Sequence, residues 1–313
     1  MIIANPIYDV VFKRLMEDKR IAKFFIETLL DEEIIEVQVK PQEFTFYKDL
    51  EQLKESGDFE KIKDQIAGLL GLSVYRLDFI ATIKTGNNEY KKVLIEIQKA
   101  KNPIDLMRFR NYLGEQYKKE DEIETEKGKE TLVLPIITIY LLGFKLPEIE
   151  TIAIKVNRQY FDLISKQVIL QKSDFIEKLT HDCYVVQISR INGKLRNRLE
   201  QMLSVFEQNF FVDKKGIIKD YAHEIKDENI KNMIALLHKT GTDPKERQEI
   251  EKEQEVYRIL DLTAKEKTKE LEGIIKEKDK VLEEKDKVLE EKDKVLEEKN
   301  KEIEELKRLL YKR

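Results

Sequence analysis

Three polar residues lie inside otherwise apolar stretches of the sequence, and their spacing could support metal chemistry. Glu96 and Gln98 stand two residues apart in LIEIQ, so an extended backbone directs both side chains to one face of a strand. Asp78 lies in the preceding apolar stretch, RLDFIATI. Two carboxylates on adjacent strands repel each other unless a cation lies between them, and oxygen donors of this kind bind Mg²⁺ or the similar Mn²⁺.

A divalent ion at this place would lower the pKa of a bound water molecule and stabilise charge on an attacked phosphoryl group. Gln98 could then orient the water or contact a phosphate oxygen. The alternative is an edge hairpin with one polar face, on which Asp78 and Glu96 only meet solvent. On spacing alone this alternative is favoured, because short motifs of this kind often occur by chance.

The elements around these residues predict an α/β fold. The acidic residues lie in two strand-like stretches, 74–83 and 92–100, and the connector KTGNNEY is typical of a hairpin turn. Apolar residues recur at helical spacing after Asn5-Pro6, and alternate with polar ones at 35–39. A helix is predicted at 103–120, and the nearly continuous apolar run at 132–144 favours a strand buried on both faces.

Several of these motifs together resemble the PD-(D/E)XK nuclease superfamily, and within it the Rpn-like recombination-promoting nucleases and putative transposases. The resemblance covers about residues 1–250. It rests on NPIYDVVFKRLM, YRLDF, IEIQKA, PIDLMRFRNYLGEQY, LPIITIYLLGF and FIEKLTHDCYVVQISRI, in that order. Each motif is weak by itself, but their order and spacing are fairly specific.

The resemblance implies a restriction-endonuclease-like αβββαβ core whose central hairpin carries a metal site, and an activity that cuts DNA with Mg²⁺ or a similar ion. It also implies that Asp78 and Glu96 hold the metal. This sequence has Gln98 where the superfamily has a catalytic lysine, so the source of the missing positive charge is open. Lys99 is next to it but faces the other side of an ideal strand, and Lys13 on the first helix is a further candidate.

Two further sets of residues have alternative interpretations. Asp9, near Lys13, could be a helix-start acid beside a positive dipole end, and this role is slightly favoured. Lys99, Lys101, Arg108 and Tyr112 could form a rim that contacts the DNA backbone, since Arg108 and Tyr112 are four apart on the predicted helix. A solvated helix face with half-buried tyrosines is the alternative for this rim.

Domain boundaries follow from composition and pattern. Residues 1–145 form the predicted core, with an insertion at 48–72, and 146–245 form a mixed, mainly helical subdomain. Of the 69 residues from 245 to 313, 20 are Lys or Arg and 22 are Asp or Glu. KDKVLEE occurs there three times, but its core positions would include aspartates. A solvated charged helix at 246–313 is therefore preferred, and a weak coiled coil is the alternative.

Composition predicts a cytoplasmic protein, and the resemblance implies that it is an enzyme. The single cysteine, Cys183, is consistent with a reducing compartment, and no run is long enough to span a membrane. We expect a Mg²⁺-dependent DNA endonuclease acting in transposition, recombination or defence against foreign DNA. A homodimer would suit double-strand cutting, and a regulatory protein partner would restrain a harmful activity. The alternative is a catalytically inactive DNA- or protein-binding module with a helical oligomerisation tail.

Overall fold

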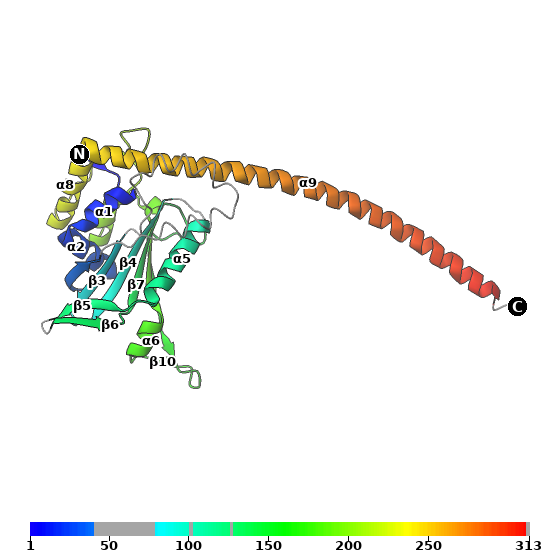
Figure 1. Ribbon diagram of the computed structural model, residues 1–313, viewed down its shortest axis with the longest axis horizontal. Helices are drawn as coiled ribbons and strands as arrows, with labels where there is room; N and C mark the ends of the chain where they lie inside the picture. The colour runs from blue at the N-terminus through cyan, green and yellow to red at the C-terminus, as the bar shows by residue number, and fades with distance from the viewer. Residues whose placement is uncertain (41–78, 100–102, 126–127, 311–313) are drawn as a thin grey trace. The chain divides into compact units, whose positions relative to one another are not determined.

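A computed structural model describes residues 1–40, 79–99, 103–125 and 128–310 (Figure 1). The chain forms two compact units, Met1–Val256 and Tyr257–Arg313. Asp78, Lys101 and the predicted insertion at 48–72 lie outside the described residues.

The first unit is a mixed α/β domain. Its strands are β1 (Ile2–Ala4), β2 (Ile34–Val39), β3 (Phe79–Thr85), β4 (Tyr90–Gln98), β5 (Asp121–Thr125), β6 (Gly128–Leu132), β7 (Ile136–Leu142), β8 (Ala153–Val156), β9 (Tyr160–Phe161), β10 (Val168–Ile169), β11 (His181–Gln187) and β12 (Ile218–Asp220). Its helices are α1 (Asp9–Glu17), α2 (Lys19–Leu30), α5 (Pro103–Tyr117), α6 (Asp174–Leu179), α7 (Arg198–Leu203), α8 (Glu228–Thr242) and the start of α9 (Pro244–Leu310), with 3₁₀ turns at Ile188–Arg190 and Ser204–Phe206.

Six strands form the central sheet in the order β2-β3-β4-β7-β11-β8. The β4–β7 and β7–β11 pairs are parallel, whereas the other three pairs are antiparallel. The predicted hairpin is confirmed: β3 and β4 pair across a turn in which Asn88 has a φ of 61°. Asparagine tolerates this left-handed conformation better than most residues. The expected doubly buried strand is β7, with six of its seven residues buried.

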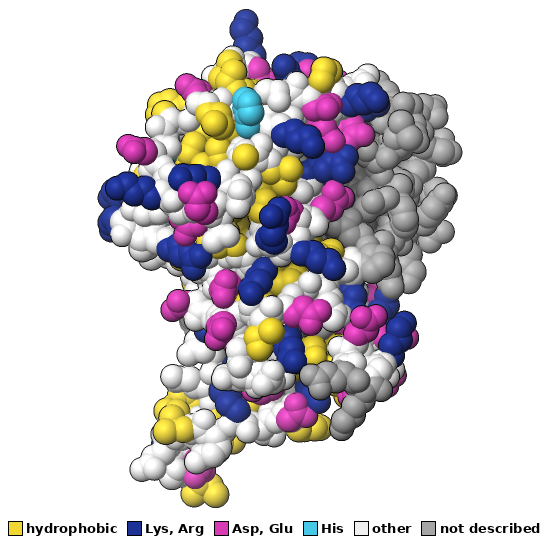
Figure 2. All heavy atoms as spheres, turned by 90° about the vertical axis from the view of Figure 1, so that its left-hand side faces the viewer, with side chains coloured by type: hydrophobic (Ala, Val, Ile, Leu, Met, Phe, Trp, Pro, Cys, Tyr) yellow, Lys and Arg dark blue, Asp and Glu magenta, His cyan; other side chains and the backbone are white. Residues whose placement is uncertain are grey.

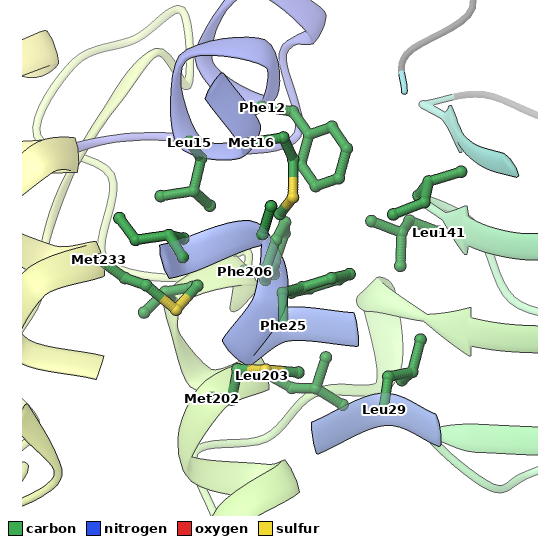
Figure 3. Close-up of a cluster of buried hydrophobic side chains, with 14 of the residues drawn as sticks. Phe12, Leu15, Met16, Phe25, Leu29, Leu141, Met202, Leu203, Phe206 and Met233 are labelled. Atoms are coloured by element: carbon green, nitrogen blue, oxygen red, sulfur yellow. The ribbon is translucent and has the colours of Figure 1, made fainter. Parts of the chain in front are cut away.

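Two layers of helices cover the sheet. Figure 1 shows α5 on one side of β3, β4 and β7, and α1, α2 and α8 on the other. The larger core lies under α1, α2 and α8, where Phe12, Phe25 and Phe206 pack with ring centroids 5.9–6.3 Å apart. Figure 3 shows these rings together with Leu141 of β7 and Met233 of α8. A smaller cluster joins α5 to the opposite face of the sheet.

Residues 146–245 do not form a subdomain with its own core, which corrects the sequence-based boundary. They supply β8 and β11 to the central sheet and add residues such as Met202, Phe206 and Met233 to the larger core. β12 pairs with β1 at the start of the chain. These pairings join residues far apart in sequence, so local periodicity could not reveal them.

The charged tail belongs to one continuous helix, α9. It begins with Pro244 in the first turn, where a missing N–H costs nothing, and Asp243 accepts the N–H groups of Lys245 and Glu246. The Val–Leu pairs of the repeats are 46–57% exposed, as a solvated helix requires. In the described part of the chain, no helix is apolar enough over a bilayer's thickness to cross a membrane.

Candidate active site on β4

Glu96 and Gln98 share one face of β4, and both are buried. Glu96 is 2% exposed and Gln98 is 8% exposed. Leu94, two residues earlier, belongs to the hydrophobic cluster on the α5 side, whereas Ile95 and Ile97 belong to the larger core on the other side. Because strand side chains alternate, the carboxyl and the amide lie on the face that α5 covers.

The strand that carries Glu96 is interior to the sheet. Glu96 lies opposite Tyr140 of the parallel neighbour β7, and Ile95 lies opposite Phe79 of the antiparallel neighbour β3. Asp78 directly precedes Phe79 in the sequence, but it lies outside the described residues. An edge hairpin with its acid in solvent is therefore wrong for Glu96, since this carboxyl is on a strand with neighbours on both sides and is almost inaccessible to water.

Two tyrosines lie near enough to Glu96 for its charge to act on them. Burial raises the pKa of the Tyr112 phenol on α5 and of the Tyr140 phenol on β7, and the negative charge of Glu96 raises both further. Phe109 packs on Tyr140 with ring centroids 4.3 Å apart, which fixes the position of that phenol. Both phenols therefore remain protonated at neutral pH and can donate hydrogen bonds.

Several buried side-chain atoms lack a hydrogen-bond partner among the described residues, and two of them lie on this face near Glu96. They are Nε2 of Gln98 and the hydroxyl oxygen of Tyr112. An unsatisfied buried polar group costs about 1–3 kcal/mol, so such groups call for a partner beyond the described residues. Solvent, a water bound to a metal ion or an oxygen of a substrate could each supply it. The unpaired amide and phenol thus mark the Glu96 face as a place for a ligand.

Lys92 lies further along the same face, and the sequence analysis missed it. Its Nζ is 2.8 Å from Oδ2 of Asp121, and the two side chains are only 3% and 10% exposed. The backbone and side-chain oxygens of Gln116 each lie 3.4 Å from the same ammonium. This ion pair joins β4 to the end of α5 and to β5. A sequence signal existed: Lys92 shares the alternation of Glu96 and Gln98, and a buried lysine requires a carboxylate.

Lys99 turns to the opposite side of the sheet. Its Nζ lies 3.8 Å from the centre of the Tyr8 ring, immediately before α1. Burial lowers the pKa of Lys99 to about 8, while the negative charges of Glu253 and Asp9 act in the other direction. Lys99 therefore contributes to a cluster at the start of α1 rather than to the Glu96 face, as the ideal strand geometry predicted.

Asp9 is the first residue of α1, so it is a helix-start acid, and it lies near Lys99 and Glu253 in this cluster. Glu253 from α9 accepts the backbone N–H groups of Asp9 at 2.8 Å and Val10 at 3.1 Å. These are N–H groups that the first turn of a helix leaves without intrahelical partners. Burial raises the pKa of the Glu253 carboxyl, and the neighbouring charge of Asp9 raises it further. Glu253 thus caps α1 from a distant part of the chain.

The remaining predicted residues are not brought to Glu96. Lys13 is half-buried on α1, which covers the other face of the sheet. Tyr112 is 4% exposed, so it is a buried neighbour of Glu96 rather than a residue of an exposed DNA-contacting rim. The side chain of Arg108 lies outside the described residues, as does Lys101.

Comparisons with protein families, with curated proteins and with solved structures found no match. The case for a function therefore rests on the residues of this face and on the motifs of the sequence.

The donor atoms on the Glu96 face suit a hard divalent ion. Among the described residues, no three or more His, Cys, Asp or Glu side chains gather as a metal-binding group. Mg²⁺ does not require one, because it commonly uses one or two protein carboxylates and keeps several water molecules. The Glu96 carboxylate and the Gln98 amide are oxygen donors of the required kind, and the unpaired Gln98 Nε2 could hold a water of the ion's shell. Zinc is less suitable, because it favours nitrogen and sulfur ligands.

Proposed function

We propose that this chain is a metal-dependent DNA endonuclease that hydrolyses phosphodiester bonds. The observation that carries this function is Glu96, a carboxyl buried on an interior strand beside an amide and a phenol that lack partners among the described residues. The order of elements supports it, because α2, β2, β3, β4, α5 and β7 follow one another as helix, three strands, helix and strand, with only the β5–β6 hairpin between α5 and β7. This is the order that the sequence motifs imply for a nuclease core.

Each residue has a distinct role in this proposal. Asp78 and Glu96 would hold Mg²⁺ or Mn²⁺, which would lower the pKa of a water molecule and stabilise charge on the phosphoryl group. Gln98 directs its amide at the water or at a phosphate oxygen. Tyr112 keeps its proton, so its hydroxyl can donate to an oxyanion near Glu96. Arg108 and Lys101 remain the candidates for backbone contacts, while Lys99 is committed to Tyr8.

A binding module without catalysis is the second candidate, and the position of the lysines favours it. Lys99 points away from Glu96, and Lys92 is paired with Asp121. In the described part of the Glu96 face, therefore, no lysine remains to activate water. A module of this kind could keep the fold and bind DNA or protein without turnover.

Nicking of supercoiled plasmid DNA tests the nuclease. The parent should cut in the presence of Mg²⁺ or Mn²⁺, and a chelator should abolish cutting. Glu96→Gln and Asp78→Asn should each reduce the rate about 100-fold or more, a typical loss when a group that stabilises transition-state charge is removed. Glu89→Ala is the matched control, since its exposed carboxyl lies at the turn of the same hairpin. Its rate should stay within about twofold of the parent.

Two outcomes would overturn the nuclease. Cutting that persists at the parental rate in Glu96→Gln would place the activity elsewhere. The parent could also fail to cut, and Mn²⁺ titration calorimetry could show no binding that depends on Glu96. The non-catalytic binding module would then be the function that remains.

A further inference from the structure

Residues 156–179 form an apolar surface that the proposed nuclease chemistry does not use. This surface comprises the end of β8, the β9–β10 hairpin and α6. Figure 1 places β10 and α6 at the lower end of the first unit, where Figure 2 shows hydrophobic side chains in yellow. Ten large hydrophobic side chains here are 39–94% exposed: Val156, Phe161, Leu163, Ile164, Val168, Ile169, Leu170, Phe175, Ile176 and Leu179.

A network of paired polar residues joins the start of this segment to its helix. The Arg158 guanidinium lies 2.8 Å from both Glu177 and Asp182, and its own side chain is 17% exposed. The Tyr160 hydroxyl donates to Glu177, and Lys172 lies 3.3 Å from the same carboxylate. This network fastens the hairpin to α6 and β11. The network therefore fixes the base of the hairpin against α6, while Leu163 and Ile164 lie in the turn beyond it.

The charge of the segment excludes some partners. Residues 156–179 contain four basic residues (Arg158, Lys166, Lys172, Lys178) and three acidic ones (Asp162, Asp174, Glu177), so the segment is close to neutral. Binding to nucleic acid or to an anionic membrane depends on an excess of Lys and Arg. A nearly neutral apolar surface instead suits a partner whose contact surface is also apolar and carries little net charge.

The exposed area is large enough for a stable interface. A large apolar side chain offers roughly 150–200 Å² when fully exposed, so the ten residues leave on the order of 1,000 Å² in water. The largest apolar patch on a typical monomer is about 300–600 Å², and each partner in a standard interface buries about 800 Å². A nearly neutral patch of this size can pair with its own copy across a twofold axis, because each copy presents the same surface.

We propose that residues 156–179 bind the same surface of a second copy of this chain, which makes the protein a symmetric dimer. β8 lies at the end of the strand order of the central sheet, so this interface would also cover a sheet edge. The dimer does not depend on the nuclease activity, and it differs from association through the charged tail. In the tail only one Val–Leu pair in seven residues is apolar.

Sedimentation equilibrium of the full chain measures the dimer directly. The parent should show twice the mass of the 37.2 kDa chain at micromolar concentration. The triple variant Leu163→Glu, Ile164→Lys, Leu170→Gln keeps the net charge and replaces the three most exposed side chains, at 79%, 94% and 83%. Its dimer dissociation constant should rise about 100-fold or more, as for central interface residues.

The matched control is Leu282→Gln, Leu289→Gln, Leu296→Gln in the tail, whose side chains are 56–57% exposed. This variant should remain a dimer. Circular dichroism of each variant should match the parent, because the replaced groups are exposed in the monomer. A monomeric parent at every concentration, or a dimer lost only in the tail variant, would overturn the dimer through 156–179. Binding of a monomeric parent to neutral phosphatidylcholine vesicles, lost in the triple variant, would reassign the surface to lipid.

Discussion

Lys92 and Glu96 show two different ways in which one strand face accommodates a buried charge. The Lys92 ammonium has its countercharge within the chain, on Asp121 at 2.8 Å. Near Glu96, by contrast, Nε2 of Gln98 and the hydroxyl oxygen of Tyr112 have no hydrogen-bond partner among the described residues. A buried charge with its countercharge inside the chain has a structural role, whereas unsatisfied groups beside a carboxyl are what a binding site offers to its ligand.

Lys92→Met should lower the free energy of unfolding by about 3–5 kcal/mol, because it leaves Asp121 buried without its partner. Denaturation by guanidinium chloride measures this loss. The double variant Lys92→Met, Asp121→Leu removes both charges and should recover most of the lost stability. A double variant no more stable than Lys92→Met alone would show that the ion pair is not what joins β4 to β5.

Sequence reasoning at the scale of single residues succeeded where alternation alone decides the direction of a side chain. It placed Glu96 and Gln98 on one face and Lys99 on the other, as the structure shows. It could not foresee that Glu253 caps α1 or that Asp121 neutralises Lys92, because the partners come from separate elements. For Tyr112 the alternative of half-buried tyrosines came nearer than the exposed rim, since the side chain is buried between α5 and the sheet.

At the scale of elements, the end of β4 is held against β7 by a close backbone contact. The N–H of Gly143 donates to the carbonyl of Gln98 at 2.7 Å. A Cβ at Gly143 would lie 2.5 Å from the carbonyl oxygen of Lys99 and 3.0 Å from Ile7. Only glycine fits here, and this contact fixes the backbone that carries Gln98.

Gly143→Ala should therefore destabilise the fold by about 1–3 kcal/mol, the usual cost of overpacking. It should also slow metal-dependent cutting beyond the loss of folded protein, because the end of β4 must shift. Gly114→Ala is the control, since a Cβ there meets nothing within 4 Å and alanine favours the α5 helix. Thermal unfolding and plasmid nicking of both variants measure these effects. Equal stability of the two variants would contradict the close fit at Gly143.

Elements were predictable where the local pattern is strong. The β3–β4 hairpin has its turn residues, and β7 has its continuous apolar run. The first predicted helix is divided in two, because Asp18 caps a new helix with its side chain on the N–H of Arg20. The assignment of 146–245 to a separate subdomain failed for another reason: β11 pairs with β7, whose residues lie about 45 positions earlier.

At the scale of the whole molecule, the boundary between body and tail lies within α9 and not at its start. Ile250 is fully buried in the larger core, and Glu253 caps α1. The charge pattern suggested residue 246 as the boundary, because composition changes there. Contacts place the end of the compact unit at Val256.

A chain that ends at Val256 should keep the stability of the body to within about 1 kcal/mol, since distant surface residues contribute little. A chain that ends at Glu249 should lose about 3 kcal/mol or more, because it lacks the Ile250 side chain and the Glu253 cap. Guanidinium denaturation followed by tyrosine fluorescence compares the two. Equal stability of both truncated chains would show that the base of α9 adds nothing to the body.

The contact of the first residues with the last part of the body also has a consequence for biosynthesis. β1 must wait for β12, and α1 must wait for Glu253, so the core closes only when nearly the whole body has left the ribosome. At roughly 5–20 residues per second, the 57 residues from Tyr257 to Arg313 take about 3–11 s to add. Translation of the tail thus gives the body an interval in which to close while it is still tethered.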